Sequence, residues 1–476
     1  MVYNSLTFQK EEFKTIKPNE VLMYVCGPTV YDSPHLGHAK SAVAFDLVHR
    51  YLKFKGYNVK LVKNYTDIDD KIIKRANERN IDFNTLSEQY IKEYEDIMNA
   101  LNVEKDYMNP RATETIDFMI EVIQGLIKNE HAYERNGSVY YSVKTFPKYD
   151  SIFQNVKAGE LHDDNEDIED QDIAYGDDKE DPRDFALWKK HKEGEPYWES
   201  PWGNGRPGWH IECSSMSVNI LGETLDIHGG GQDLKFPHHR NEIAQSEGYT
   251  GKKFANYFMH NGFVNVDDEK MSKSLGNFFL VSEVIKNYDP MVIRLFLFSS
   301  HYRSSINYSL DNMNQAKKNY NRLLSTIRNI HELNIQDISS KNIKELILEI
   351  EKAEKSIIEA MDDDFNTPIA LAEFLRLFRV INREVLENKL PINKNFKDKF
   401  FNFVDDMNKI FGLFPNLKSQ LALGDEGSLD EKGAILQNLL KIIYDVRAEL
   451  RTRKIYDLSD KIRDKLKELG INVEDK

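Results

Sequence analysis

Two short motifs, about 230 residues apart, carry side chains suited to phosphate chemistry. The first is His35-Leu36-Gly37-His38, whose imidazoles can donate hydrogen bonds to phosphate oxygens and whose glycine allows close approach of a nucleotide. The second spans residues 270–274 (KMSKS). Its lysines, Lys270 and Lys273, could stabilise negative charge on a transferring phosphate group. Either motif alone is compatible with a solvated surface segment, but their occurrence in one chain indicates an enzyme that uses a nucleotide.

The two cysteines of the chain, Cys26 and Cys213, pose a separate question. The start of the sequence lacks the basic and then apolar layout of a secretory signal, so we expect a cytoplasmic protein without a structural disulfide. His238 and Glu242 are four residues apart and would share one face of a helix. Two thiolates, an imidazole and a carboxylate could form a zinc site. Spacing alone, however, favours two unrelated buried thiols and a histidine held in the core.

The elements that must position these residues alternate between strands and helices. An apolar run at 21–26 ends at Gly27, which predicts a buried strand closed by a turn. A helix at about 38–56 and a strand at 58–63 complete a βαβ unit and predict a parallel sheet. Further strands are expected at 224–228 and 256–260, and further helices at about 237–247 and 289–299. Ligands bind beyond the carboxyl ends of such strands, where the first motif falls.

The second half of the sequence predicts helices only. They are expected at about 311–333, 341–360, 368–388, 395–412, 431–452 and 458–469, with a polar linker at 421–430. We therefore expect an α/β fold, a Rossmann-type doubly wound parallel sheet with an insertion, followed by an all-α C-terminal region. The expected domains are the first half of the Rossmann domain (1–104), the insertion (105–205), the second half of the Rossmann domain (206–255) and the region of the second motif (256–310). A helical bundle (311–420) and a C-terminal segment (421–476) follow.

Composition sets limits on the partners of the protein. The 476 residues are 40% hydrophobic and 30% charged, which excludes wholesale disorder, and no apolar run is long enough to cross a bilayer. The net charge of −14 argues against a generally basic surface. Residues 160–184 alone hold 13 carboxylates against two bases, a net charge of −11. The rest of the chain is near neutral, so an anionic polymer is not excluded as a partner.

The two motifs resemble the HIGH and KMSKS signatures of class I aminoacyl-tRNA synthetases, with Leu36 in place of isoleucine. Their flanks resemble the cysteinyl family in particular, in the segments 26–32 (CGPTVYD), 66–71 (TDIDDK), 208–213 (GWHIEC), 226–231 (DIHGGG) and 236–239 (FPHH). The similarity is strong from about residue 3 to residue 308. It is weaker through 361–367 (MDDDFNT) and the final helices, and members of the family often continue beyond the point where this chain ends.

The resemblance implies a reaction and its catalytic groups. Cysteine would be activated by ATP, with Mg²⁺, to cysteinyl-adenylate, and the cysteinyl group would then pass to the 3′-terminal ribose of tRNA-Cys. No protein nucleophile is needed, so catalysis would rest on positioning and charge stabilisation. The residues implied to contact phosphates are His35, His38, Lys270 and Lys273.

The resemblance also implies substrate and metal contacts. The family's zinc ligands fall on Cys26, Cys213, His238 and Glu242, and one zinc ion would select the substrate thiolate over the hydroxyl of serine. His239, beside one of these ligands, is expected to point elsewhere on the helix. The residues expected to contact cysteine or ATP are Gly27, Thr66, Trp209, His228, Gly229, Gly230, Asp233 and Lys273.

The resemblance also implies that the helical C-terminal region binds tRNA, that the last segment reads the anticodon and that residues 256–310 hold the second motif and contact the tRNA stem. It further suggests a monomer. Basic side chains at Arg447, Arg451, Arg453 and Lys454 suit a phosphate backbone, although an ordinary charged helix face would look the same. Three alternatives stay open: a ligase that joins cysteine to an amino sugar, a non-catalytic paralogue that binds nucleotide or RNA, and a zinc-stabilised binding module. The two intact motifs and the long helical region argue against them.

Overall fold

The computed structural model describes residues 1–153, 179–267, 269–270, 278–338, 340–415 and 456–468, with short pieces between 417 and 453. The chain forms two compact units, Met1–Pro415 and Asn416–Lys476. The acidic stretch at 160–184 and the predicted linker and helix between 421 and 452 lie mostly outside the described residues. The domain boundaries expected from the sequence stay predictions.

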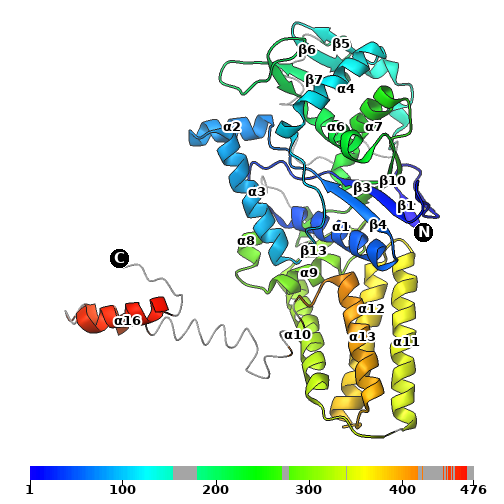
Figure 1. The fold of residues 1–476 in the computed structure, drawn as a ribbon, viewed down its shortest axis with the longest axis vertical. Coiled ribbons are helices and arrows are strands. Elements are labelled where there is room, and N and C mark those ends of the chain that lie inside the picture. The colour runs from blue at the N-terminus through cyan, green and yellow to red at the C-terminus, as the bar shows by residue number, and fades with distance from the viewer. Residues whose placement is uncertain are drawn as a thin grey trace. The chain divides into compact units, whose positions relative to one another are not determined.

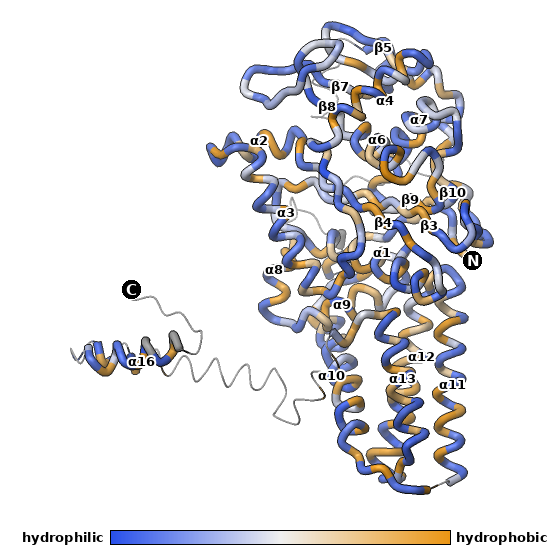
Figure 2. The backbone as a smooth tube through the Cα atoms, viewed as in Figure 1, coloured by the Kyte–Doolittle hydropathy of each residue, from blue (hydrophilic) through white to orange (hydrophobic). Residues whose placement is uncertain are grey.

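The centre of the first unit is a four-stranded parallel sheet in the order β10-β9-β3-β4. Its strands are β3 (Glu20–Val25), β4 (Asn58–Lys63), β9 (Leu225–Gly231) and β10 (Ala255–Asn261). Five of the six residues of β3 are buried, as expected of a strand covered on both faces, and apolar residues gather along this sheet (Figure 2). A doubly wound parallel sheet is thus confirmed.

Three helices hold the first motif and most of the expected metal ligands (Figure 1). The helix α1 (Leu36–Phe54) joins β3 to β4, and α6 (Trp209–Leu221) and α7 (His238–Thr250) lie on either side of β9 in sequence. The start of α1 is capped by the first motif itself. His35 Nδ1 accepts from the Gly37 amide at 3.0 Å, and His38 Nδ1 accepts from the His35 amide at 3.3 Å. The motif therefore satisfies amides that the first helical turn leaves without partners.

The segment between the two halves of the sheet contains helices and a second sheet. The helices are α2 (Asp70–Arg79), α3 (Phe83–Ala100) and α4 (Ile116–Lys128). The second sheet is antiparallel in the order β5-β6-β7-β8, formed by β5 (Ala132–Arg135), β6 (Ser138–Tyr141), β7 (Phe185–Lys190) and β8 (Gly205–Pro207). The segment also contains short 3-10 turns at Ala112–Glu114, Val143–Thr145 and Tyr149–Ser151, and another, Gln232–Lys235, follows β9.

After β10 the chain forms a small sheet and then helices. The sheet consists of β11 (Val264–Val266), β12 (Glu269–Lys270) and β13 (Ile306–Tyr308), with α8 (Val281–Val284) and α9 (Pro290–Phe298) between its last two strands. A hairpin of β1 (Val2–Asn4) and β2 (Gln9–Glu11) lies at the N-terminus. The bundle helices are α10 (Leu310–Glu332), α11 (Lys341–Asp362), α12 (Thr367–Ile381) and α13 (Lys394–Phe411), and α16 (Tyr456–Glu468) belongs to the second unit.

The helix predicted at about 368–388 is confirmed in its extent but changes type along its length. Its α-helical part ends at Ile381, and Asn382–Glu387 continue as a π-helix. Hydrophobic spacing cannot distinguish the two over six residues, because the change affects the hydrogen-bond pattern more than the buried face. Among the described residues, no helix combines the length and apolar character that crossing a bilayer requires.

A buried ionic network joins the bundle to the sheet domain. Asp46 of α1 accepts from Arg50 Nε at 2.7 Å and pairs with Arg294 of α9, and all three side chains are buried. Arg294 Nε also donates to the Phe411 carbonyl, at the C-terminus of α13, at 2.7 Å. Positive charge is favourable at a helix C-terminus, and each oxygen here has a donor. The network therefore fastens α13 to the helix that carries the first motif.

Candidate metal centre and active site

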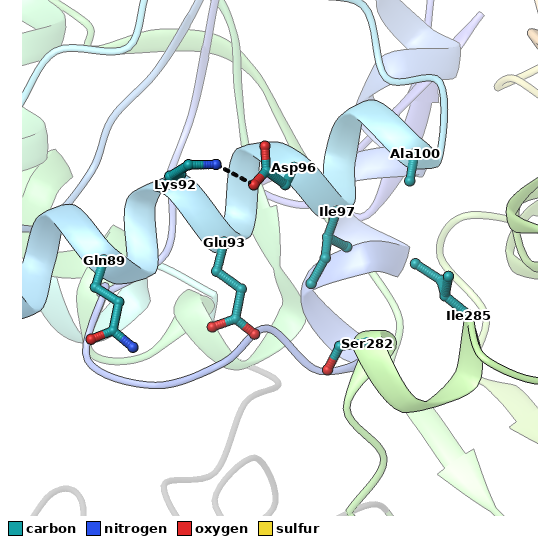
Figure 3. Close-up of a pocket in the computed structure, with 8 residues that line it drawn as sticks. All are labelled: Gln89, Lys92, Glu93, Asp96, Ile97, Ala100, Ser282 and Ile285. Atoms are coloured by element: carbon teal, nitrogen blue, oxygen red, sulfur yellow. Dashed lines mark hydrogen bonds and ion pairs between the residues drawn. The ribbon is translucent and has the colours of Figure 1, made fainter. Parts of the chain in front are cut away.

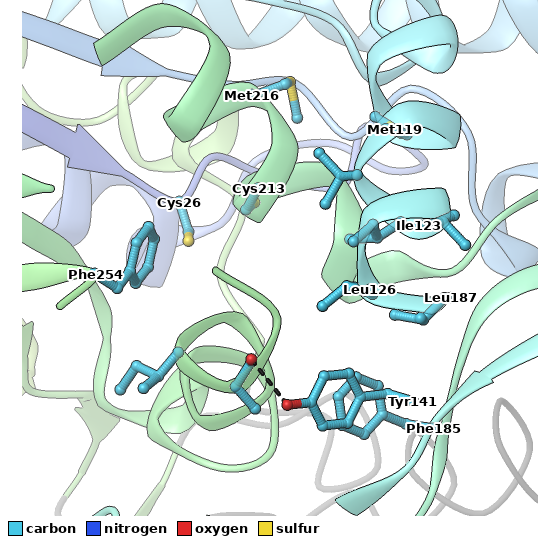
Figure 4. Close-up of a cluster of buried hydrophobic side chains, with 14 of the residues drawn as sticks. Cys26, Met119, Ile123, Leu126, Tyr141, Phe185, Leu187, Cys213, Met216 and Phe254 are labelled. Atoms are coloured by element: carbon cyan, nitrogen blue, oxygen red, sulfur yellow. Dashed lines mark hydrogen bonds between the residues drawn. The ribbon is translucent and has the colours of Figure 1, made fainter. Parts of the chain in front are cut away.

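Four side chains from three elements meet at the carboxyl ends of the central strands. Cys26 directly follows β3, Cys213 lies in α6, and His238 and Glu242 lie one turn apart in α7. All four are buried, and their potential ligand atoms all lie within 4.8 Å of one another. Glu242 Oε1 is 3.1 Å from His238 Nε2 and 3.3 Å from Cys26 Sγ. Figure 4 shows the two cysteines side by side, one from the end of the strand and one from the helix.

The chemistry of this donor set fits a zinc ion. Tetrahedral Zn²⁺ with bonds of about 2.0–2.3 Å keeps its ligand atoms roughly 3.3–3.8 Å apart, so the cluster needs only a small contraction. Burial raises the pKa of both Cys26 and Cys213. Burial alone would also raise the pKa of Glu242, but the neighbouring His228 and His238 bring it below its usual range. A bound cation would lower the pKa of the thiols and so stabilise both as thiolate ligands.

A second possible set shares two members of the first. Cys26 and Glu242 also lie within 4.8 Å of His228, on β9, and His239, on α7. The expectation that His239 points away from the site is wrong, since its Nε2 lies 3.9 Å from Glu242 Oε1. One position along a helix turns a side chain by about 100°, and the flank of the site formed by β9 lies in that direction. Donor chemistry favours the first set, which offers two thiols to a zinc ion.

The metal-facing histidine has a buried partner that the sequence did not single out. His210 Nδ1 lies 2.9 Å from His238 Nδ1, on the side of the ring opposite to Glu242. Burial lowers the pKa of His210 to about 3, with a smaller effect from the charge of Lys189. The neutral ring can therefore accept a hydrogen bond from His238, as the outer partners of metal-bound histidines do. The only signal in the sequence was its position three residues before Cys213.

The predicted contacts for the amino acid lie beside this cluster. The Gly27 amide donates to Asn64 Oδ1 at 2.8 Å, and a Cβ at this glycine would lie 1.6 Å from the Asn64 carbonyl oxygen. The Thr66 hydroxyl accepts from Asn64 Nδ2 at 3.3 Å, and burial raises the pKa of the neighbouring Glu212 carboxyl. The indole ring of Trp209 lies 4.2 Å from the His238 ring, centroid to centroid. The structure thus brings Gly27, Thr66 and Trp209 to the edge of the cluster.

The first motif lies against Phe278 and Phe279, which follow the second motif in the sequence. The rings of His35 and His38 are stacked with centroids 3.8 Å apart, and the Phe278 ring is 4.9 Å from that of His35. The Leu36 amide donates to the Phe279 carbonyl at 3.2 Å. Of the second motif, the structure places the backbone of Lys270, which belongs to β12, whereas Lys273 lies outside the described residues. The segment that follows the lysines is therefore anchored on the helix start that carries both histidines.

The glycines predicted to contact ATP have packing roles in the structure. A Cβ at Gly229 would lie 2.4 Å from the Phe45 ring, and one at Gly230 would lie 2.8 Å from Leu234. The imidazole of His228 is fully buried and its Nε2 lies 3.2 Å from Glu242 Oε2, so it faces the metal cluster. Asp233 lies in the 3-10 turn that follows β9. The contacts of these four residues with adenosine stay predictions.

A separate pocket lies between α3 and α8 (Figure 3). Its volume is about 410 Å³, and its lining includes Glu93, Ile97, Ser282 and Ile285 together with the ion pair of Lys92 and Asp96, 2.6 Å long. None of the residues predicted for the site lines this pocket. This pocket is therefore separate from the site at the strand ends.

Comparisons with known proteins define the class. Residues 12–318 match the catalytic domain of the class I (C) tRNA synthetases, and residues 356–415 match the DALR domain. The structure resembles Mycobacterium tuberculosis methionyl-tRNA synthetase in complex with methionyl-adenylate, at 12% identity and a TM-score of 0.59, over 83% of this chain and 90% of that one. It also resembles the agnB2 LeuRS–tRNA–LeuAMS complex of Agrobacterium radiobacter K84, at 11% identity and a TM-score of 0.59, over 84% and 85%. The fold is that of these synthetases.

Relatives by sequence narrow the class further. The chain is 47% identical to the cysteine–tRNA ligase of Thermococcus gammatolerans and 43% identical to that of Anoxybacillus flavithermus, in both cases over 100% of this chain and 97% of the relative. The chain therefore belongs to the cysteine–tRNA ligase family of class I aminoacyl-tRNA synthetases, which are enzymes. This confirms the family resemblance and the fold class inferred from the motifs.

Proposed function

We propose that this protein activates cysteine with ATP and Mg²⁺, forming cysteinyl-adenylate and pyrophosphate, and transfers the cysteinyl group to the 3′-terminal ribose of tRNA-Cys. The observation that carries the proposal is the meeting of Cys26, Cys213, His238 and Glu242 beside Gly27 and Thr66. A buried group of soft donors next to the strand ends is suited to hold a metal where the side chain of the amino acid arrives.

Selection of cysteine over serine is the part of the proposal that needs a metal. A pocket of ordinary side chains separates near-isosteres by only about 10²-fold. A bound Zn²⁺ would supply a soft Lewis acid that prefers a thiolate to a hydroxyl. Its ligands would be the same four side chains, and the neutral His210 would hold His238 in the required orientation. Trp209, which packs on His238, would cover the substrate side chain.

The phosphate chemistry falls to the two motifs. His35 and His38 would contact the phosphates as the carboxylate of cysteine attacks the α-phosphorus, and their place at the N-terminus of α1 adds the favourable field of the helix. Lys270 and Lys273 would stabilise the departing pyrophosphate from the opposite side. The anchoring of Phe278 and Phe279 on the first motif supports this arrangement, because the lysines lie within eight residues of that anchor. Gly229, Gly230, Asp233 and the backbone of His228 would contact adenosine.

Recognition of tRNA falls to the helical regions. The bundle α10–α13 includes the DALR match and would bind the body of the tRNA. In the second unit, Arg447 is unsuited to a phosphate contact, because its side chain is buried and its Nε donates to the Ser459 carbonyl at 3.0 Å. Arg451 and Arg453 remain candidates for the anticodon segment, and Lys454 lies outside the described residues. The expectation of a monomer rests on the family resemblance, and that of a cytoplasmic location rests on the sequence pattern alone.

A charging assay tests the proposal. Total tRNA is incubated with ATP and labelled cysteine or labelled serine, before and after removal of metal with a chelator. We expect charging with cysteine only, lost with the metal and restored by Zn²⁺. A discrimination against serine that survives metal removal would refute the selection argument. Charging of an amino sugar in place of tRNA, or binding of tRNA without charging, would favour the alternative functions.

A substitution separates the role of the second motif from that of the metal site. Lys273→Ala is expected to lower the rate of cysteine-dependent ATP–pyrophosphate exchange strongly, while the affinity for cysteine changes little. The matched control is Lys341→Ala, at the exposed start of α11, which should leave exchange unchanged. Exchange at the wild-type rate in the Lys273 variant would contradict the assigned role.

A further inference from the structure

The two thiols of the metal cluster are also the only two in the chain. Their sulfur atoms lie within 4.8 Å of each other, and both side chains are buried. We propose that Cys26 and Cys213 form a reversible disulfide under oxidising conditions, which ejects the metal and switches off the site.

The geometry permits this bond without rebuilding the fold. A disulfide requires a sulfur separation of about 2.05 Å, so the sulfurs must approach by at most about 3 Å, a distance that side-chain rotation and a small shift can cover. Cys26 directly follows β3 and its amide donates to the Gly229 carbonyl of β9 at 2.9 Å, so the approach of the sulfurs rests on rotation of its side chain. Cys213 lies in the second turn of α6 and provides the fixed partner.

The surroundings favour Cys26 as the first thiol to react. It is 7% exposed, whereas Cys213 is 2% exposed, and its Sγ lies 3.6 Å from His228 Nε2. Access rests on the proposed function in one respect: a site that admits the thiol of substrate cysteine also admits a molecule as small as hydrogen peroxide. A metal-bound thiolate is the reactive form of the side chain, so the loaded site is the one poised for oxidation.

The chemistry balances with hydrogen peroxide as oxidant. The Cys26 thiolate attacks one oxygen of peroxide, forms a sulfenic acid and releases hydroxide. The Cys213 thiolate then attacks that sulfur, forms the S–S bond and displaces a second hydroxide. Counting the protons of the thiols, two thiols and one peroxide yield a disulfide and two waters, with two electrons passing from sulfur to oxygen. The first set then keeps only His238 and Glu242, and although His228 and His239 lie beside Glu242, the loss of both thiolates removes the soft donors that favour zinc, so the metal is released.

The test uses the full chain loaded with Zn²⁺. The protein is titrated with hydrogen peroxide, free thiols are alkylated, and peptides are mapped by mass spectrometry while a chromogenic indicator measures released zinc. We expect a Cys26–Cys213 cross-linked peptide, one zinc released per disulfide and at least a tenfold fall in cysteine charging. Dithiothreitol with added Zn²⁺ should restore all three. Thiols that stay alkylatable, zinc that stays bound, or charging that persists in the disulfide form would each overturn the proposal.

A single-cysteine variant and a metal-free sample complete the design. In Cys213→Ser, peroxide should leave a sulfenic acid on Cys26 that dimedone labels, with no disulfide; labelling elsewhere or none would refute the assigned order of reaction. If this variant does not fold, the peptide map of the wild-type protein decides alone. Since disulfide formation and zinc release are measured without tRNA, a failure of charging in the untreated protein would count against the proposed function and not against the switch.

Discussion

The contact between His210 and His238 leads to a quantitative prediction about metal affinity. His238 Nε2 faces Glu242 and the cluster, at 3.1 Å from its Oε1, so a metal would be bound through this nitrogen. The proton of the ring then resides on Nδ1, which lies 2.9 Å from Nδ1 of His210. Because burial brings the pKa of His210 to about 3, its ring is neutral near pH 7 and its Nδ1 can accept that proton's hydrogen bond.

Replacing His210 by alanine removes this acceptor inside a buried site. His238 is 2% exposed, so its Nδ1–H would be left without a partner at a cost of about 1–3 kcal/mol. With about 1.4 kcal/mol per tenfold change, His210→Ala should weaken zinc binding roughly 10- to 100-fold, the usual range for outer partners of metal ligands. His210→Asn keeps an acceptor oxygen and should recover most of the loss.

The assay is a competition for zinc between each variant and a chromogenic chelator at pH 7.5. Urea unfolding of the metal-free proteins shows whether the variants fold, so that a general loss of structure is separated from a loss of metal affinity. If folded His210→Ala binds zinc within threefold of the wild type, the hydrogen bond does not orient His238 and the reasoning fails.

Two further predictions concern stability. Burial lowers the pKa of Lys40 to about 7, and within the described part of the chain its ammonium donates to two neutral oxygens, Ser300 Oγ at 3.1 Å and the Ser304 carbonyl at 2.8 Å. The unfolded chain keeps this proton up to about pH 10.4, whereas the folded protein releases it above about pH 7. The free energy of unfolding should therefore rise between pH 7 and 10, by up to about 1.4 kcal/mol per pH unit. In Lys40→Met, measured by urea unfolding, this contribution should vanish, and an unchanged slope would contradict the prediction. Arg294→Met leaves the buried Asp46 carboxylate with Arg50 as its one remaining cation in the network, and it should cost up to about 3–5 kcal/mol by the same measurement. The exposed Arg383→Met should cost under about 1 kcal/mol, and equal effects would show that the buried network contributes little.

The strands and helices of the sheet were predictable because burial leaves a pattern in the sequence. The apolar run ending at Gly27 predicted β3 to within one residue, and the βαβ order fixed the parallel pairing of β3 with β4. The order β10-β9-β3-β4 could not be derived in the same way, because pairing between strands about 200 residues apart depends on the whole fold. The π-helical turn after Ile381 was missed because it preserves the buried face of α12.

Some residues of the candidate site could be predicted from the sequence and others could not. Only helical spacing linked His238 to Glu242, and the joining of Cys26 to Cys213, 187 residues later, came from the family resemblance. Contacts that run across helices, such as that of His210 with His238, leave no periodic trace in the sequence. The two glycines after His228 were assigned to ATP by type alone, whereas the structure adds a second reason for them, the close approach of Phe45 and Leu234.

The network of Asp46, Arg50 and Arg294 has a consequence for any large ligand. It clamps α13 to the helix that begins with His35, and α11 alone, with 22 residues, reaches about 33 Å away from that junction (Figure 1). If tRNA contacts both ends, as proposed, the clamp would hold the two contact regions at a defined spacing. Molecules of another length or curvature would then reach one end and miss the other, so the scaffold would select by shape.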